Sequence, residues 1–208
     1  MAVYHLKTPL SKEDVSKLNV GDTVYLSGEI FTGRSRIHRY IFDENNVMPV
    51  DTAKRNAMVH VGPIVTIDEN GKYELVSFMP TSSLRFEKWG AKSVSEWGLR
   101  MIVGKTTMGK ETIEAMQKYG CVHVSPQCVS PNLWQDSIKI QGVELFSELG
   151  SIEACWQMEL SELGPFIVDI DTNGRCYFDE LDVEVAKNRE TALDAMGVPK
   201  DFVPTKLY

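Results

Sequence analysis

Short runs of β-branched and aromatic residues, separated by helical segments of uneven length, most strongly constrain the fold of this chain. The clearest run extends from Thr23 to Phe31 and predicts a strand that leads directly into Gly33. The pair Asn173-Gly174 predicts a hairpin turn late in the chain. Strands and helices alternate without the regular repeat of a doubly wound parallel fold. The sequence therefore predicts a mixed α/β protein, with a mixed sheet and flanking helices.

The remaining elements are predicted from apolar spacing and from turn residues. A first helix is expected to begin at Ser11, because Ser11 and Asp14 have the spacing of a capping box. Further helices are expected at 35–42, at 84–98 with an interruption at Gly90, from a cap at Thr107 to Gly120, and at 181–196. Further strands are expected at 59–65, 73–78, 100–103, 121–124, 153–160, 166–170 and 175–178. The sequence shows no repeat, low-complexity tract or linker, which favours a single domain over residues 1–208.

The charge and hydropathy of the sequence argue against several classes of protein. The formal net charge is −7 at pH 7, which disfavours nucleic acid or an anionic membrane as the main partner. No apolar run approaches the ~18 residues of a membrane span. The N-terminus lacks a basic segment followed by an apolar core, so no signal peptide is indicated and a cytoplasmic location is expected. A glycine-rich nucleotide-binding motif is also absent from the sequence.

Three cations and one hydroxyl lie beside turns that contain Gly, Pro or Ser, close to the ends of predicted strands. These residues are Arg34, Thr81, Arg85 and Lys105. Guanidinium groups bind carboxylates through two parallel hydrogen bonds, and a lysine adds a point charge. Loops at strand ends often converge on a ligand. The sequence therefore predicts a site for a small dianion, and the acidic net charge makes an accidental cluster of cations a poor explanation.

The cysteines do not indicate a metal site. The chain contains four of them, and no pair has CxxC spacing: Cys121, Cys128, Cys155 and Cys176. We interpret them mostly as small buried hydrophobic residues. Cys128 lies in a loop-like stretch and is expected to be more exposed. No metal ligand is therefore predicted in this chain.

Several segments spread over nearly the whole chain share the pattern of one enzyme family. They are 6–11, 20–28, Thr32-Gly33-Arg34 followed by His38, 61–63, 153–159 and the turn at 173–174. In these segments the chain resembles the β subunit, or C-terminal domain, of class I fumarate hydratases and L(+)-tartrate dehydratases. The substrate loop of that family reads Gly-Pro-Thr-Thr-x-Gly-Arg. Residues 79–85 keep its Pro, first Thr and Arg but replace both glycines and the second Thr. The family's glycine-rich stretch after Gly120 is also replaced here, by residues 121–128.

The resemblance implies a swivelling β/β/α domain with a mixed sheet or barrel flanked by helices. It also implies an α subunit that holds a [4Fe-4S] cluster through three cysteines, in a hetero-oligomer such as α2β2, while this chain supplies the other wall of the site. The implied reaction is reversible elimination of water from a 2-hydroxy dicarboxylate, and malate with its product fumarate is the first candidate substrate pair. L(+)-tartrate or another 2-hydroxy dicarboxylate is the alternative substrate, and a non-catalytic dicarboxylate-binding module is the alternative of a different class.

The resemblance also implies roles for individual residues. Arg85 and Lys105 match the groups that hold the substrate carboxylates, and Thr81 matches the proposed base. A threonine hydroxyl is a weak base and needs activation, which Arg34 is expected to supply together with an acid of the partner. His38, one helical turn after Arg34, is expected to orient Arg34 or to relay a proton.

Each of these residues also has a structural interpretation. Arg34, with Arg36 and Arg39, also fits a solvated helix face, and Thr81 fits a cap of the following helix. Arg85 also fits an ion pair with Glu87. Lys105 fits a surface lysine, and His38 a structural histidine. His60 and His123 lie in apolar strands and are interpreted as histidines at the edge of the core, and the four tryptophans as core or subunit-interface residues.

Overall fold

Five strands of the first part of the chain form a closed ring. The computed structural model describes residues 1–127, 130–203 and 205, and the chain divides into two compact units, Met1–Cys176 and Tyr177–Tyr208. The strands of the ring are β2 (Thr23–Thr32), β3 (Ala57–Val59), β6 (Met101–Val103), β7 (Val122–Pro126) and β9 (Cys155–Ile170). The first four are parallel neighbours, and β9 closes the ring by pairing antiparallel with both β7 and β2.

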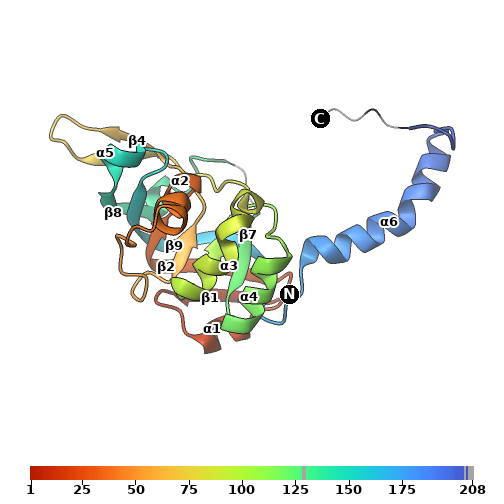
Figure 1. Cartoon of the computed structure of the whole chain (residues 1–208), viewed down its shortest axis with the longest axis horizontal. Coiled ribbons are helices and arrows are strands. Elements are labelled where there is room, and N and C mark those ends of the chain that lie inside the picture. The colour runs from red at the N-terminus through yellow and green to blue at the C-terminus, as the bar shows by residue number, and fades with distance from the viewer. Residues whose placement is uncertain (128–129, 204, 206–208) are drawn as a thin grey trace. The chain divides into compact units, whose positions relative to one another are not determined.

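Two further strands extend this sheet, and a separate hairpin lies outside it. Strand β1 (Val3–Lys7) pairs parallel with β2, and β8 (Ile138–Glu144) pairs antiparallel with β9. Strands β4 (Ile64–Ile67) and β5 (Tyr73–Ser77) form the separate antiparallel hairpin (Figure 1). The mixed barrel-like sheet with its helices confirms the predicted α/β fold class.

The helices begin and end at residues with identifiable roles. Helix α1 (Lys12–Ser16) has the capping box expected from Ser11 and Asp14. Helix α2 (Ser35–His38) continues into a π-helical turn, η1 (Arg39–Asp43). Helix α4 (Lys110–Tyr119) ends at Gly120, which has a left-handed backbone. The remaining helical elements are η2 (Ser83–Phe86), α3 (Glu87–Glu96), η3 (Gln135–Ser137), α5 (Phe146–Leu149) and, in the second unit, α6 (Tyr177–Ala195).

The core lies inside the ring of strands, where alternate residues of β2 point inward. Val24, Leu26 and Ile30 are fully buried, and the fully buried Trp156 of β9 belongs to the same cluster. Trp97 and Trp134 are also buried, as the interpretation of the tryptophans as core residues requires. Within the described part of the chain, no helix has both the length and the hydropathy needed to span a membrane.

Two predictions about helices were wrong. Helix α3 runs through Gly90 without interruption. A Cβ atom at that position would lie 2.1 Å from Oγ1 of Thr112, so the glycine permits close packing of α3 against α4 (Figure 1). Thr107 is not the cap of α4, which begins after Gly109. The Glu87 carboxylate accepts hydrogen bonds from the Gly109 and Thr112 amides instead, at 2.6 and 3.2 Å.

Predictions about strands were wrong in three places. The run at 59–65 is divided between β3 and β4, because the residues around Gly62-Pro63 leave the sheet. The runs at 153–160 and 166–170 form one strand, β9, whose register shifts absorb the residues between them. No strand forms at 175–178, because a single bridge between Ile170 and Cys176 is followed directly by helix α6. Strands β1 and β8 were not predicted.

Candidate functional site

Two of the predicted site residues, Arg34 and Lys105, follow parallel strands of the ring and share one edge of the sheet with His60, which follows the strand between them. Arg34 follows β2, His60 follows β3 and Lys105 follows β6. Backbone hydrogen bonds continue the sheet at this edge, from the Gly33 amide to the Val59 carbonyl (3.0 Å) and from the His60 amide to the Val103 carbonyl (2.8 Å). The carboxyl ends of parallel strands meet at such an edge, where side chains from different loops converge.

The segment Thr81–Ser83 adds a further set of backbone hydrogen bonds between His60 and Lys105. The Thr81 amide donates to the His60 carbonyl at 2.6 Å, and the Lys105 amide donates to the Thr81 carbonyl at 3.2 Å. The Ser83 amide then donates to the Lys105 carbonyl at 2.9 Å. The structure thus brings Thr81 and Lys105 together, although 24 positions of sequence separate them.

Arg34 lies against the backbone of the neighbouring loop. A Cβ atom at Gly62 would lie 2.5 Å from the Ile152 carbonyl oxygen and 2.8 Å from Nη1 of Arg34, so the glycine permits the close approach of both. Nε of Arg34 lies 3.4 Å from Oε1 of Glu153, which is an ion pair by distance but lacks hydrogen-bond geometry. Arg36 and Arg39 are exposed, whereas Arg34 is half-buried. Arg34 is therefore not part of the solvated face that Arg36 and Arg39 form.

His38 holds the backbone of Arg34 from inside the protein. Its Nδ1 lies 2.7 Å from the Arg34 carbonyl oxygen, and its ring stacks on Phe86 and Trp89. Burial lowers the pKa of His38 to about 4, although the hydrogen bond to Arg34 acts in the opposite direction. The imidazole is therefore neutral at pH 7 and donates its Nδ1–H to Arg34. This geometry favours the orienting role of His38, since a fully buried ring cannot touch a ligand.

Arg85 and Lys105 are the exposed cations of the site. Neither makes a salt bridge or a side-chain hydrogen bond within residues 1–127, 130–203 and 205. Glu87, the partner considered for Arg85, is occupied in capping α4. No ion pair or hydrogen bond among the described residues joins Arg85 to Thr81, Lys105 or Arg34. Both cations are available to an anion from outside the chain.

The cap interpretation of Thr81 finds no support in the described residues. Ser82, not Thr81, is the N-cap residue of η2, and it makes no side-chain cap hydrogen bond. The following helix, α3, has Phe86 at its N-cap position. Thr81 is half-buried and contributes backbone hydrogen bonds to His60 and Lys105.

Sequence reasoning missed a buried polar cluster directly behind this edge. It treated His60 and His123 as core-edge histidines, and both are indeed fully buried. In the structure, however, both are hydrogen-bonded to Ser83, and His123 is also bonded to Asp169 of β9. The available signal was Asp169 itself, because a carboxylate in an apolar strand requires a polar partner.

The described residues do not fit a metal centre. No group of three His, Cys, Asp or Glu side chains within the described ranges is arranged to hold a metal ion. Cys121, Cys155 and Cys176 are buried, and burial raises the pKa of Cys155 to about 12, whereas the thiolate is the form that binds metals. An iron–sulfur cluster does not fit these cysteines. Cys128, expected to be more exposed, lies outside the described residues.

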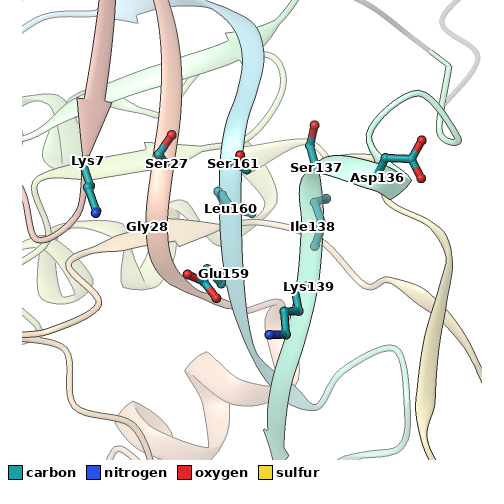
Figure 2. Close-up of a pocket in the computed structure, with 10 residues that line it drawn as sticks. All are labelled: Lys7, Ser27, Gly28, Asp136, Ser137, Ile138, Lys139, Glu159, Leu160 and Ser161. Carbon is teal, nitrogen blue, oxygen red and sulfur yellow. The ribbon is translucent and has the colours of Figure 1, made fainter.

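A cavity of about 490 Å³ lies away from this edge, between β1, β2, β8 and β9 (Figure 2). Its charged residues are Lys7, Asp136, Lys139 and Glu159. None of the five predicted site residues lines this cavity. The candidate dianion site is instead the edge where Thr81 and the exposed Lys105 meet.

Comparison with known proteins identifies the family. A family model described as "Fumarase C-terminus" matches residues 2–181. The chain belongs to this family. The L(+)-tartrate dehydratase subunit beta of Escherichia coli (strain K12) is 34% identical over 190 residues, which are 91% of this chain and 93% of that protein. A protein named "Putative fumarate hydratase class I" from Geobacillus stearothermophilus is 32% identical over 181 residues, or 86% of this chain.

The lengths of these Fumarase C-terminus relatives differ. The chain covers nearly all of the tartrate dehydratase subunit beta but only 34% of the Geobacillus protein, so it spans about a third of that relative's length. Membership of the Fumarase C-terminus family confirms the resemblance found in the sequence. The roles of Arg34, His38, Thr81, Arg85 and Lys105 remain predictions.

Proposed function

We propose that this chain is the β part of a hydro-lyase that reversibly eliminates water from a 2-hydroxy dicarboxylate. The observation that carries the proposal is the pair of backbone hydrogen bonds that join Thr81 to His60 and Lys105 to Thr81. They bring a hydroxyl group and an exposed cation to one sheet edge in a chain that belongs to the Fumarase C-terminus family.

The chemistry of water elimination matches the groups at this edge. A base must remove a proton from the carbon next to a carboxylate, and cations must stabilise the charge that builds on that carboxylate. In our proposal Lys105 and Arg85 bind the two carboxylates, and Thr81 moves the proton. Glu153 partly neutralises Arg34, so activation of the Thr81 hydroxyl requires a further group from the partner. His38 holds Arg34 in position.

The partner in this proposal is an α subunit that carries a [4Fe-4S] cluster, in a hetero-oligomer such as α2β2 in the cytoplasm. When bound to the α subunit, the cluster supplies a Lewis acid that assists departure of the substrate hydroxyl. Two observations support a partner. One relative is named as a subunit beta, and another is about three times as long as the matched region.

Malate and fumarate are the substrate pair that we propose first. L(+)-tartrate is the second candidate, and one observation favours it. The match covers 93% of a named L(+)-tartrate dehydratase subunit beta, whereas it covers 34% of the fumarate hydratase relative.

The test is anaerobic co-expression with the α partner, cluster reconstitution and assays with malate, L(+)-tartrate and citramalate. The complex is expected to turn over at least one of them, and the isolated chain is expected to be folded and inactive. Turnover by the isolated chain would contradict the need for a partner. A reconstituted complex that binds dicarboxylates without converting any of them would instead identify a binding module.

A further inference from the structure

A continuous series of side-chain hydrogen bonds lies behind the loop that carries Thr81. Nδ1 of His60 lies 2.8 Å from Oγ of Ser83, and the same oxygen lies 2.7 Å from Nε2 of His123. Nδ1 of His123 lies 2.5 Å from Oδ1 of Asp169. The other Asp169 oxygen accepts a hydrogen bond from the Ser125 hydroxyl. Four segments that are distant in sequence are thereby connected, two of them to Ser83 directly and that of Asp169 through His123.

The direction of these hydrogen bonds follows from the acceptor at one end. A carboxylate only accepts hydrogen bonds, so His123 carries a proton on Nδ1, and in its neutral form it accepts at Nε2 from the Ser83 hydroxyl. The Ser83 oxygen then accepts from Nδ1–H of His60. Burial and the neighbouring His38 and His123 hold the pKa of His60 well below its ordinary value, so His60 is neutral and can have only one N–H. Every donor between His60 and Asp169 therefore has an acceptor.

The order Ser83, His123, Asp169 is that of a nucleophilic triad, but its surroundings exclude that use. Ser83 and His123 have no exposed surface, and Asp169 is 2% exposed. The Ser83 oxygen also accepts from a second histidine, which leaves no approach for an electrophile. A nucleophile needs access to its substrate.

The surroundings of Ser83 fit a structural connection to the site instead. A Cβ atom at Gly104 would lie 1.7 Å from Oγ of Ser83, so the glycine before Lys105 leaves the space that this hydroxyl fills. The Ser83 amide donates to the Lys105 carbonyl, and Thr81 lies two residues earlier, bonded to Lys105 and His60. Displacing the Ser83 hydroxyl would therefore disturb both residues that the site depends on.

We propose that Ser83 is a positioning residue, which His123 and Asp169 hold in place so that Thr81 and Lys105 keep their spacing. The structural part of this proposal stands on the hydrogen bonds alone, and its catalytic consequence rests on the proposed hydro-lyase function. Ser83 lies at the variable position of the family's substrate loop, and His123 lies in the stretch after Gly120 that differs from the family pattern. One hydrogen bond therefore connects the substrate loop with that stretch.

The first test measures amide hydrogen exchange in the isolated chain and needs no activity. Ser83→Ala should speed exchange of the Thr81 and Lys105 amides at least tenfold. Ser93→Ala is the matched control, because Ser93 is also fully buried but bonds only within α3, to the Trp89 carbonyl. Unchanged exchange at Thr81 and Lys105 in a folded Ser83→Ala protein would overturn the proposal.

The second test reads the histidine tautomers by ¹⁵N NMR and remains available if Ser83→Ala does not fold. The wild-type protein should show His123 protonated on Nδ1. Asp169→Asn keeps the shape of the side chain but offers an amide, so it should move part of the His123 population to the Nε2–H tautomer and speed exchange of the Thr81 amide. A wild-type His123 protonated only on Nε2 would contradict the proposed series of hydrogen bonds.

The third test uses the reconstituted complex. Ser83→Ala should lower kcat about tenfold to a hundredfold with little change in KM, and Ser83→Cys should recover part of the loss. If no variant and no wild-type complex turns over a dicarboxylate, the proposed function fails, while exchange and NMR still decide the role of Ser83. If the wild-type complex is active and Ser83→Ala has normal kcat, the positioning role fails alone. Covalent labelling of Ser83 by a fluorophosphonate would show a nucleophile and also overturn it.

Discussion

The edge of the sheet has two layers that differ in exposure and composition. The buried layer consists of His38, His60, Ser83, His123 and Asp169, which are all enclosed and each make at least one hydrogen bond, whereas Nε2 of His38 and of His60 has no partner among the described residues. The outer rim consists of Thr81, Arg85 and Lys105, and its two cations are exposed. Buried polar groups are stable only when their hydrogen bonds are satisfied, whereas exposed cations require no internal partner. The comparison suggests that the buried layer sets geometry and that the outer rim binds the ligand.

The largest expected effect is on turnover when the rim hydroxyl is removed. Thr81→Ala should lower kcat of the complex by about 10²- to 10⁴-fold, because the proposed proton transfer loses its group. KM should change far less, and Thr81→Ser should retain much of the activity. Stopped-flow or steady-state kinetics, combined with the melting temperature, distinguishes a catalytic role of the Thr81 hydroxyl from a role as a helix cap. A normal kcat with a lowered melting temperature would assign Thr81 to the structural role.

The rim cations should affect substrate use without affecting stability. Arg85→Ala and Lys105→Ala should each lower kcat/KM by an amount equivalent to about 2–4 kcal/mol, because each is proposed to bind a carboxylate in a site closed by the partner. Their melting temperatures should match the wild type. Lys110→Ala is the control, since Lys110 is an exposed lysine of α4 that lies 3.9 Å from Glu114. Losses no greater than those of the control would make both residues ordinary surface cations.

The buried layer should instead make stability depend on pH. The pKa of His38 is about 4 in the folded protein and about 6.5 when exposed, so between these values the unfolded chain binds a proton that the folded chain does not. The free energy of unfolding should therefore fall as the pH falls from about 6.5 to about 4 and level off below that range. For one such group the loss approaches about 3 kcal/mol.

Urea unfolding of His38→Phe across this range tests the assignment. The variant should lose less stability on acidification than the wild type, because only His60 and the remaining groups still contribute. His5→Gln is the comparison variant, since His5 is exposed on β1 and pairs at the surface with the Glu162 carboxylate, so any change it causes measures a surface pair and not the buried layer. An identical pH dependence in wild type and His38→Phe would show that His38 does not control it.

The smallest expected effect comes from the boundary between the two layers. Gly104→Ala places a methyl group where the Ser83 hydroxyl lies, and the resulting overpacking should lower stability by about 1–3 kcal/mol. Gly71→Ala is a useful contrast, because its Cβ would meet no atom within 4 Å, although its positive φ adds backbone strain. Thermal unfolding of both variants measures the difference. Gly104→Ala should also speed exchange of the Lys105 amide, and Gly71→Ala should not.

The sequence predicted those parts of the fold that depend on contacts between neighbouring residues. The β2 strand and the Ser11–Asp14 capping box are determined by neighbouring residues, and the sequence predicted both. Strand β8 was missed because a register shift beside Gly142 breaks its alternation of apolar and polar residues. The division of β9 was wrong because the segment around Gly164-Pro165 resembles a turn, yet it stays within the strand.

The two layers of the site also differ in how far the sequence predicts them. The rim residues were predicted because each lies beside a turn close to a strand end, which is visible in the sequence. Apart from His38, the buried layer was not predicted, because its contacts join residues far apart in the chain. Ser83 and His123 are 40 positions apart, and His123 and Asp169 are 46 positions apart. Such pairings depend on which strands become neighbours, which local patterns do not determine.

The central claim is that the outer rim binds a dianion, and inhibition of the assembled complex tests it most directly. Succinate and butyrate have the same carbon chain but carry two carboxylates and one. We predict that succinate inhibits the wild-type complex much more strongly than butyrate, and that Lys105→Ala weakens inhibition by succinate at least tenfold while leaving butyrate nearly unchanged. Equal inhibition by the two acids in the wild type, or an equal loss for both in Lys105→Ala, would contradict the claim.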